Sequence, residues 1–152
     1  MSNELLSLTH GFLGLIFLMA FSGIFVWLNR ARKDDIDKIR LSVVIMLVIS
    51  LFLFITGVSA YSIYRQAGSA REFIRASNQP WVHNILMELK EFTGFYVLVL
   101  MIVVTYFVFS FNVEILKNQK LKKMLVTLLI LVMIWTLITF AFGVYITKVK
   151  PI

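Results

Sequence analysis

The sequence predicts an all-α polytopic membrane protein, in which four hydrophobic helices cross a bilayer and pack as an up-down bundle. Hydrophobic residues make up 60% of the chain and the mean hydropathy is +0.89, whereas a soluble domain is about half apolar. The excess is concentrated in four blocks, each long enough for a membrane helix, which takes roughly 20 apolar residues. We expect one membrane domain, residues 1–152.

The first two blocks predict spans at about residues 5–28 and 41–62. Trp27 and Arg30 mark the far end of the first span, since aromatic and basic side chains favour the membrane interface. The second span ends in a face of small residues around Gly57. Small residues let helix backbones approach closely in a membrane, so this face is expected to pack against a neighbouring helix.

The last two blocks predict spans at about residues 80–112 and 124–146. Asn78 and Pro80 give the third helix a start signal, because an N-cap residue is followed by proline near the first helical position. This helix is longer than a bilayer requires, so its first turns should project beyond the hydrocarbon. The polar connection before it, residues 65–79, can form a short amphipathic turn on the membrane surface.

The distribution of Lys and Arg between the connections determines the predicted topology. The first and third connections hold nine of the fifteen Lys and Arg residues, so the positive-inside rule places them in the cytoplasm. Both termini are then outside, and the protein is expected in the plasma (cytoplasmic) membrane. This topology puts His10, His83 and the long second connection on the outer face.

Composition excludes several function classes. The chain has no cysteine, which removes disulfides, iron–sulfur clusters and cysteine nucleophiles. The net charge of +7 comes from Lys and Arg near helix ends, where topology and anionic lipid headgroups account for it, so we expect no nucleic-acid partner. No constellation for hydrolysis and no phosphate-binding glycine loop is visible. The expected partners are the lipid bilayer and other membrane-protein subunits.

His10 and His83 are the only histidines in the chain. Imidazoles from two facing helices can hold one haem b, each donating an axial nitrogen to the iron. Gly11 and Gly14 would leave room for the ring edge. The candidate walls are Phe12, Phe95 and Tyr96. The simpler interpretation is that both histidines are polar anchors at the interface and no cofactor is bound.

Copper and quinone chemistry are the remaining alternatives at these histidines. His83 and Met87 are four residues apart and share one helix face, so with His10 they could hold copper, which accepts soft ligands. Glu88 and Glu91 could relay protons, as quinone chemistry requires. An ordinary solvated face is the simpler interpretation of these two carboxylates, since Lys90 lies between them.

Threonines inside the spans are expected to bond to their own helix backbone or to a neighbouring helix. They are Thr56, Thr105, Thr136 and Thr139.

The run His10-Gly11-Phe12-Leu13, followed by an apolar helix and by Arg30, resembles the first core helix of four-helix transmembrane cytochromes b of the ascorbate- or quinol-linked type. That resemblance implies histidine-ligated haem on several helices. Here the second and fourth helices have no histidine, so an inner haem is excluded, and at most one outer haem held by His10 and His83 remains.

Two functions follow from these observations. The first is a small subunit of an electron-transfer or redox membrane complex, with one outer-side haem b and a quinone as a further partner. The second is a non-catalytic accessory subunit of a respiratory complex or a metal monooxygenase, with no cofactor of its own. In both cases the chain is expected to be part of an enzyme complex rather than an enzyme alone.

Overall fold

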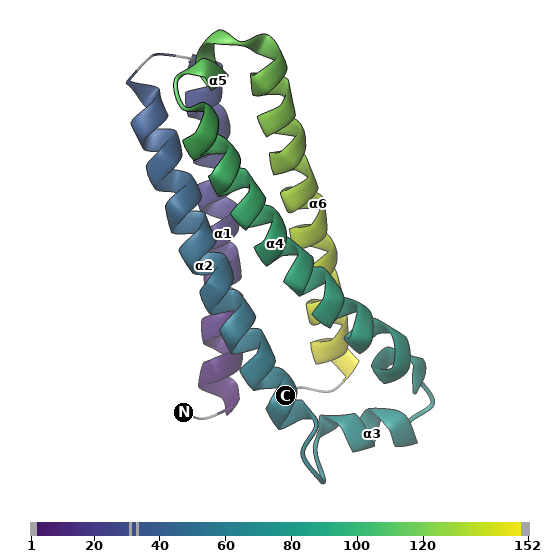
Figure 1. Cartoon of the computed structure of the whole chain (residues 1–152). Coiled ribbons are helices and arrows are strands. Elements are labelled where there is room, and N and C mark those ends of the chain that lie inside the picture. Colours follow the sequence, from purple (N-terminus) through teal and green to yellow (C-terminus); the bar gives the residue numbers. More distant parts are fainter. Residues whose placement is uncertain (1–2, 31, 33, 150–152) are drawn as a thin grey trace.

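The computed structural model describes residues 3–30, 32 and 34–149, and within these residues the chain is helical with no strand. The elements are α1 (Asn3–Arg30), α2 (Asp35–Tyr64), α3 (Ala70–Ala76), the π-helix η1 (Val82–Met87), α4 (Glu88–Phe111), α5 (Glu114–Lys117) and α6 (Gln119–Val149) (Figure 1). The predicted all-α class is confirmed.

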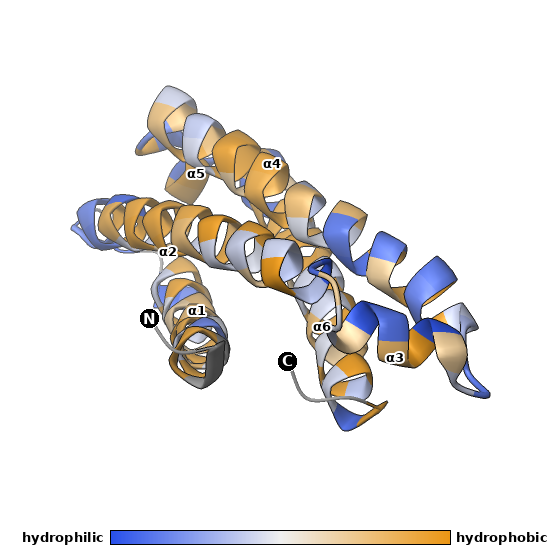
Figure 2. Ribbon diagram, turned by 90° about the horizontal axis from the view of Figure 1, so that it is seen from below, coloured by the Kyte–Doolittle hydropathy of each residue, from blue (hydrophilic) through white to orange (hydrophobic). Residues whose placement is uncertain are grey.

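Four of these segments are long and apolar enough to cross a membrane: Leu8–Arg30, Asp35–Tyr64, Val82–Phe111 and Gln119–Val149. Hydrophobic residues dominate the middle of these helices, while hydrophilic residues gather at the start of α2, in α3 and at the start of α4 (Figure 2). The prediction of an integral membrane protein with four spans is therefore confirmed. The first turn of α1 and the last turn of α6 lie at the same end of the bundle (Figure 1).

The long helices form a chain of neighbours rather than a closed ring. Helix α2 packs against both α1 and α4, and α4 packs against α6, whereas α1 and α6 touch at few points. We call the end that carries α5 the packed end and the end that carries α3 the open end (Figure 1). The main core fills the packed end with fully buried side chains, including Phe17, Ile24, Met46, Val104 and Leu129.

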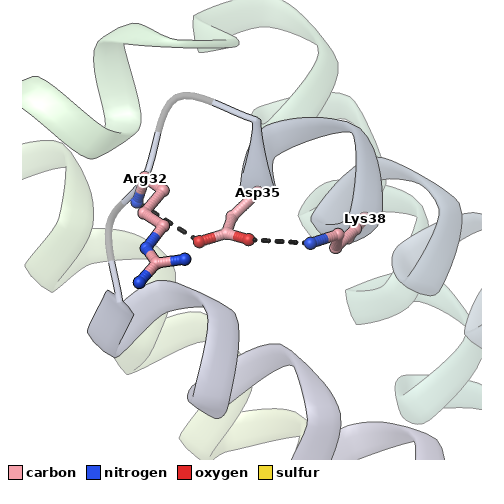
Figure 3. Close-up of polar contacts among 3 residues, drawn as sticks. All are labelled: Arg32, Asp35 and Lys38. Carbon is pink, nitrogen blue, oxygen red and sulfur yellow. Dashed lines mark hydrogen bonds and ion pairs between the residues drawn. The ribbon is translucent and has the colours of Figure 1, made fainter.

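Helix α2 begins six residues before the predicted span, because its first turn is charged and hydropathy does not detect it. Asp35 lies in that turn, where a carboxylate favours the positive end of the helix dipole. One carboxylate oxygen lies 3.1 Å from the Lys38 ammonium, and the other accepts a hydrogen bond from the Arg32 backbone N–H at 3.3 Å (Figure 3). From Asp35 onward, the predicted charged connection is therefore the first part of α2.

The third span differs from its prediction in one respect. The helix start predicted at Pro80 is confirmed within two residues, and the predicted amphipathic turn is α3. However, the first turns of the third span, Val82–Met87, form a π-helix before the regular α-helix begins. A π-turn has one more residue per hydrogen-bonded ring, and it is frequent at functional sites.

Candidate functional site

A cavity of about 610 Å³ lies in the open end, between all four long helices. Helices α1 and α6 both line it but touch at few points, so its wall is least closed by helix packing between these two helices. Five of the seven glycines line it: Gly11 and Gly14 of α1, Gly57 of α2, Gly94 of α4 and Gly143 of α6. A Cβ atom built on Gly11 or Gly14 meets nothing within 4 Å, so these two glycines leave open space.

Most of the cavity wall is apolar, with side chains such as Leu18, Phe54, Val97 and Phe140. Its hydroxyl groups are already committed to their own helices, as predicted for the threonines in the spans. The Thr136 hydroxyl donates to the Val132 carbonyl at 2.7 Å, and the Thr139 hydroxyl donates to the Trp135 carbonyl at 2.8 Å. The hydroxyls of Thr105 and Thr56 also lie within hydrogen-bond distance of carbonyl oxygens one turn earlier in their own helices.

Four ionisable side chains also line the cavity: His10, Lys90, Glu91 and Lys148. Lys148 is exposed, and the other three are half-buried. Lys90 passes close to α6, since its Cε lies 3.6 Å from a Cβ built on Gly143. No ion pair or side-chain hydrogen bond joins Lys90 or Glu91 to another described residue. The solvated-face interpretation holds for the exposed Glu88, but Lys90 and Glu91 face the cavity, which corrects that interpretation.

His10 is held by α2. Its Nδ1 lies 2.8 Å from the Thr56 Oγ1, and its Cε1 lies 3.5 Å from a Cβ built on Gly57. The small-residue face predicted around Gly57 therefore receives the His10 ring. No described residue contacts Nε2 of this ring by a hydrogen bond, which leaves that atom free for a ligand.

His83 lies outside the cavity, in a separate buried cluster. This cluster contains Tyr64, Ala70, Ile74, Val82, Met87 and Ile146. The Tyr64 hydroxyl lies 3.0 Å from Nδ1 of His83, and the two rings are 5.7 Å apart. Met87 is buried in the same cluster, as its four-residue spacing from His83 predicts.

The structure thus does not bring His10 and His83 into one cavity. Each ring binds α2, at Thr56 and at Tyr64 respectively, and only His10 faces the open space. Within the described residues no three His, Asp or Glu side chains gather as metal ligands. A haem or copper shared by both histidines stays a prediction, and it would need the two rings, which the structure places at different sites, to approach one another.

The side chains named as candidate walls for a haem do not line this cavity. Phe12, Phe95 and Tyr96 are exposed on the outside of the bundle and do not line the cavity. Gly11 and Gly14 do line it, as predicted. Lys90 and Thr56 were missed as site residues, although glycines at similar depth in all four helices are a signal that could have located the cavity.

No protein-family model matches this sequence, and neither a curated protein nor a solved structure is detectably similar to it. The site must therefore be interpreted from its own chemistry. An apolar cavity with a few polar groups at one end suits an amphipathic molecule that reaches it through the bilayer.

Proposed function

We propose that this chain is a small integral-membrane subunit of an electron-transfer complex, and that its cavity binds a quinone-class carrier from the bilayer. The observation that supports this is the combination of a mostly apolar wall, in which α1 and α6 make few contacts, with four ionisable side chains that line it. Its volume of about 610 Å³ is in the usual range of pockets for small molecules. A quinone has the matching chemistry, an apolar tail and ring with two polar oxygens.

The unpaired charged side chains in the cavity favour a bound ligand that offers them hydrogen-bond partners. Ionisable side chains in membrane spans are costly and usually mark functional sites. Lys90 and Glu91 have no ion-pair partner among the described residues, and they interact only through longer-range electrostatics. A ligand oxygen that accepts a hydrogen bond from the Lys90 ammonium would offset part of that cost.

Quinone binding to the protein in lipid nanodiscs tests the proposal. We expect a short-chain quinone to quench tryptophan fluorescence in a saturable way, since Trp135 lies next to Thr136 of the cavity wall. Gly14→Leu fills open space in the cavity and should weaken binding by about tenfold or more. Gly23→Ala, on the same helix but outside the cavity, should bind like the wild type.

Saturable binding that is lost in Gly14→Leu and kept in Gly23→Ala supports the proposal. Quenching that never saturates, or that is equal in all three proteins, shows only partition into lipid and rejects the quinone site.

A second candidate, a haem b ligated by His10, is favoured by the hydrogen bond between Nδ1 and Thr56, which orients the ring and leaves Nε2 free. When bound, haem would supply one-electron transfer, and His10 would hold its iron. Protein expressed with haem supplied should then show a reduced-minus-oxidised haem b spectrum that His10→Ala abolishes. Loss of the spectrum in His83→Ala as well would support the bis-histidine site, and a colourless wild type would reject this candidate.

A non-catalytic accessory subunit without a cofactor remains the alternative to the quinone-binding and the haem-binding subunit. The opening between α1 and α6 is lined by Gly11 and Gly14, and small residues favour close packing of a partner helix. Purification from native membranes in a mild detergent separates these functions. Stable co-purified subunits that shield Gly11→Cys from thiol labelling would support a partner helix in the opening, and a ligand-bound monomer would argue against it.

A further inference from the structure

The contacts of the Thr56 hydroxyl favour one tautomer of His10. The Thr56 hydroxyl lies 2.8 Å from the Phe52 carbonyl, 3.1 Å from the Leu53 carbonyl and 2.8 Å from Nδ1 of His10. A hydroxyl has one hydrogen to donate and two lone pairs to accept. Carbonyl oxygens can only accept, so we assign the hydrogen of Thr56 to its own helix backbone and the contact with His10 to a hydrogen bond that the ring donates.

His10 therefore carries its proton on Nδ1. In the neutral imidazole one ring nitrogen donates and the other accepts, and the tautomer is inferred from the partners. No carboxylate pairs with the ring among the described residues, which favours the neutral form in a membrane site. Nε2 is then an unprotonated acceptor, and no described residue donates to it.

The remaining polar groups of the cavity add to this acceptor character. The hydroxyls of Thr136, Thr139, Thr147 and Ser50 all donate to their own helix backbones. The Glu91 carboxylate accepts when ionised, and the charged donors among the described lining residues are Lys90 and the exposed Lys148. A ligand head that only accepts hydrogen bonds would leave both Nε2 of His10 and the Glu91 carboxylate without a donor.

We infer that the cavity is selective for a ligand head that donates hydrogen bonds, that is, for the dihydroxy (quinol) form of the carrier over a form without O–H groups. This inference rests on the proposed function and specifies which state of the ligand the site binds. Thr56 is a positioning residue, because it acts through the His10 ring and has no free hydrogen for the ligand.

The tautomer and the selectivity can be measured separately. Nitrogen-15 NMR of histidine-labelled protein distinguishes a protonated ring nitrogen from an unprotonated one, and the signal that His10→Gln removes belongs to His10. Binding is compared between a short-chain quinol and its dimethyl ether, which has the same ring and tail but no O–H. We expect the quinol to bind about tenfold more tightly, the cost of an unpaired buried acceptor.

Thr56→Val removes the acceptor for Nδ1–H and should abolish both the fixed tautomer and the selectivity. Thr105→Val is the matched control, because Thr105 bonds to its own helix at Met101 and does not line the cavity. The control should keep the wild-type tautomer and the wild-type ratio of the two affinities.

The outcomes separate the inference from the proposed function. A proton on Nε2, or equal affinity for quinol and dimethyl ether, overturns the inference while a quinone site still stands. Absence of saturable binding for the quinone and for both quinol compounds overturns the proposed function and the inference together. Selectivity that Thr56→Val removes and Thr105→Val keeps supports both.

Discussion

The two ends of the bundle differ in the size of the side chains that the same helices place between them. On α1, the packed end buries Phe17, Phe21 and Ile24, whereas the open end presents Gly11 and Gly14. Large side chains fill the space at one end, and glycines leave a cavity of about 610 Å³ at the other. The cavity is therefore encoded by residue size along continuous helices rather than by a change in topology.

The packed end and the open end also differ in whether their charged side chains are paired. At the packed end the buried Asp35 is paired with Lys38 and with a backbone N–H. At the open end Lys90 and Glu91 face the cavity without an ion pair among the described residues. Packing and pairing fill the space between the long helices at one end, whereas the cavity at the other end contains unpaired charged side chains. Four substitutions test this division, from the largest expected effect to the smallest.

Phe17→Ala should destabilise the protein by about 3–5 kcal/mol, because it opens a cavity where Phe17 is fully buried in the main core. Unfolding in mixed micelles measures the change. Leu18→Ala, the next residue, is the matched control, since Leu18 is only half-buried and lines the existing cavity. Its cost should be clearly smaller, and equal costs at the two positions would contradict the division into a packed and an open end.

Tyr64→Phe should cost about 1–3 kcal/mol, because it leaves Nδ1 of the buried His83 without its partner at 3.0 Å. Tyr61→Phe is the control, since Tyr61 is half-buried and its hydroxyl has no hydrogen bond among the described residues. Thermal unfolding of both variants gives the comparison. No loss in Tyr64→Phe would mean that the histidine cluster does not contribute to stability.

Lys90→Met should stabilise the ligand-free protein by about 1 kcal/mol, since it removes an unpaired ammonium from a membrane site. The same substitution should weaken quinone binding, so stability and affinity should change in opposite directions. Lys117→Met, an exposed lysine in α5, should change neither. A destabilised Lys90→Met protein would show that the open end depends on this charge for folding.

The sequence predicted the spans well, because a bilayer imposes hydrophobicity on every lipid-facing residue. It placed the starts of α2 and α6 too late, at residues 41 and 124 rather than at Asp35 and Gln119, because a charged first turn is helical without being apolar. The π-helix Val82–Met87 was not predictable, since its hydrogen bonds depend on local packing and not on hydropathy.

The site was predictable only in part. Depth along the helices follows from the sequence, and both histidines contact the last third of α2, at Thr56 and at Tyr64, as their prediction at one end of the bundle requires. Which neighbour each ring meets depends on helix rotation and order, which hydropathy does not define. Both rings contact α2, so the pairing expected between them is replaced by Thr56 and Tyr64.

Gly11→Ala should have the smallest effect on stability, and it tests whether the glycines themselves leave the cavity open. A methyl group at Gly11 meets nothing within 4 Å, and alanine favours a helix over glycine by about 0.5–1 kcal/mol, so the variant should be slightly more stable. Gly68→Ala is the opposite control, because Gly68 has a φ of +71° that alanine adopts only with strain. A destabilised Gly11→Ala would mean that α1 packs closely at the open end, which would remove the physical basis for the cavity.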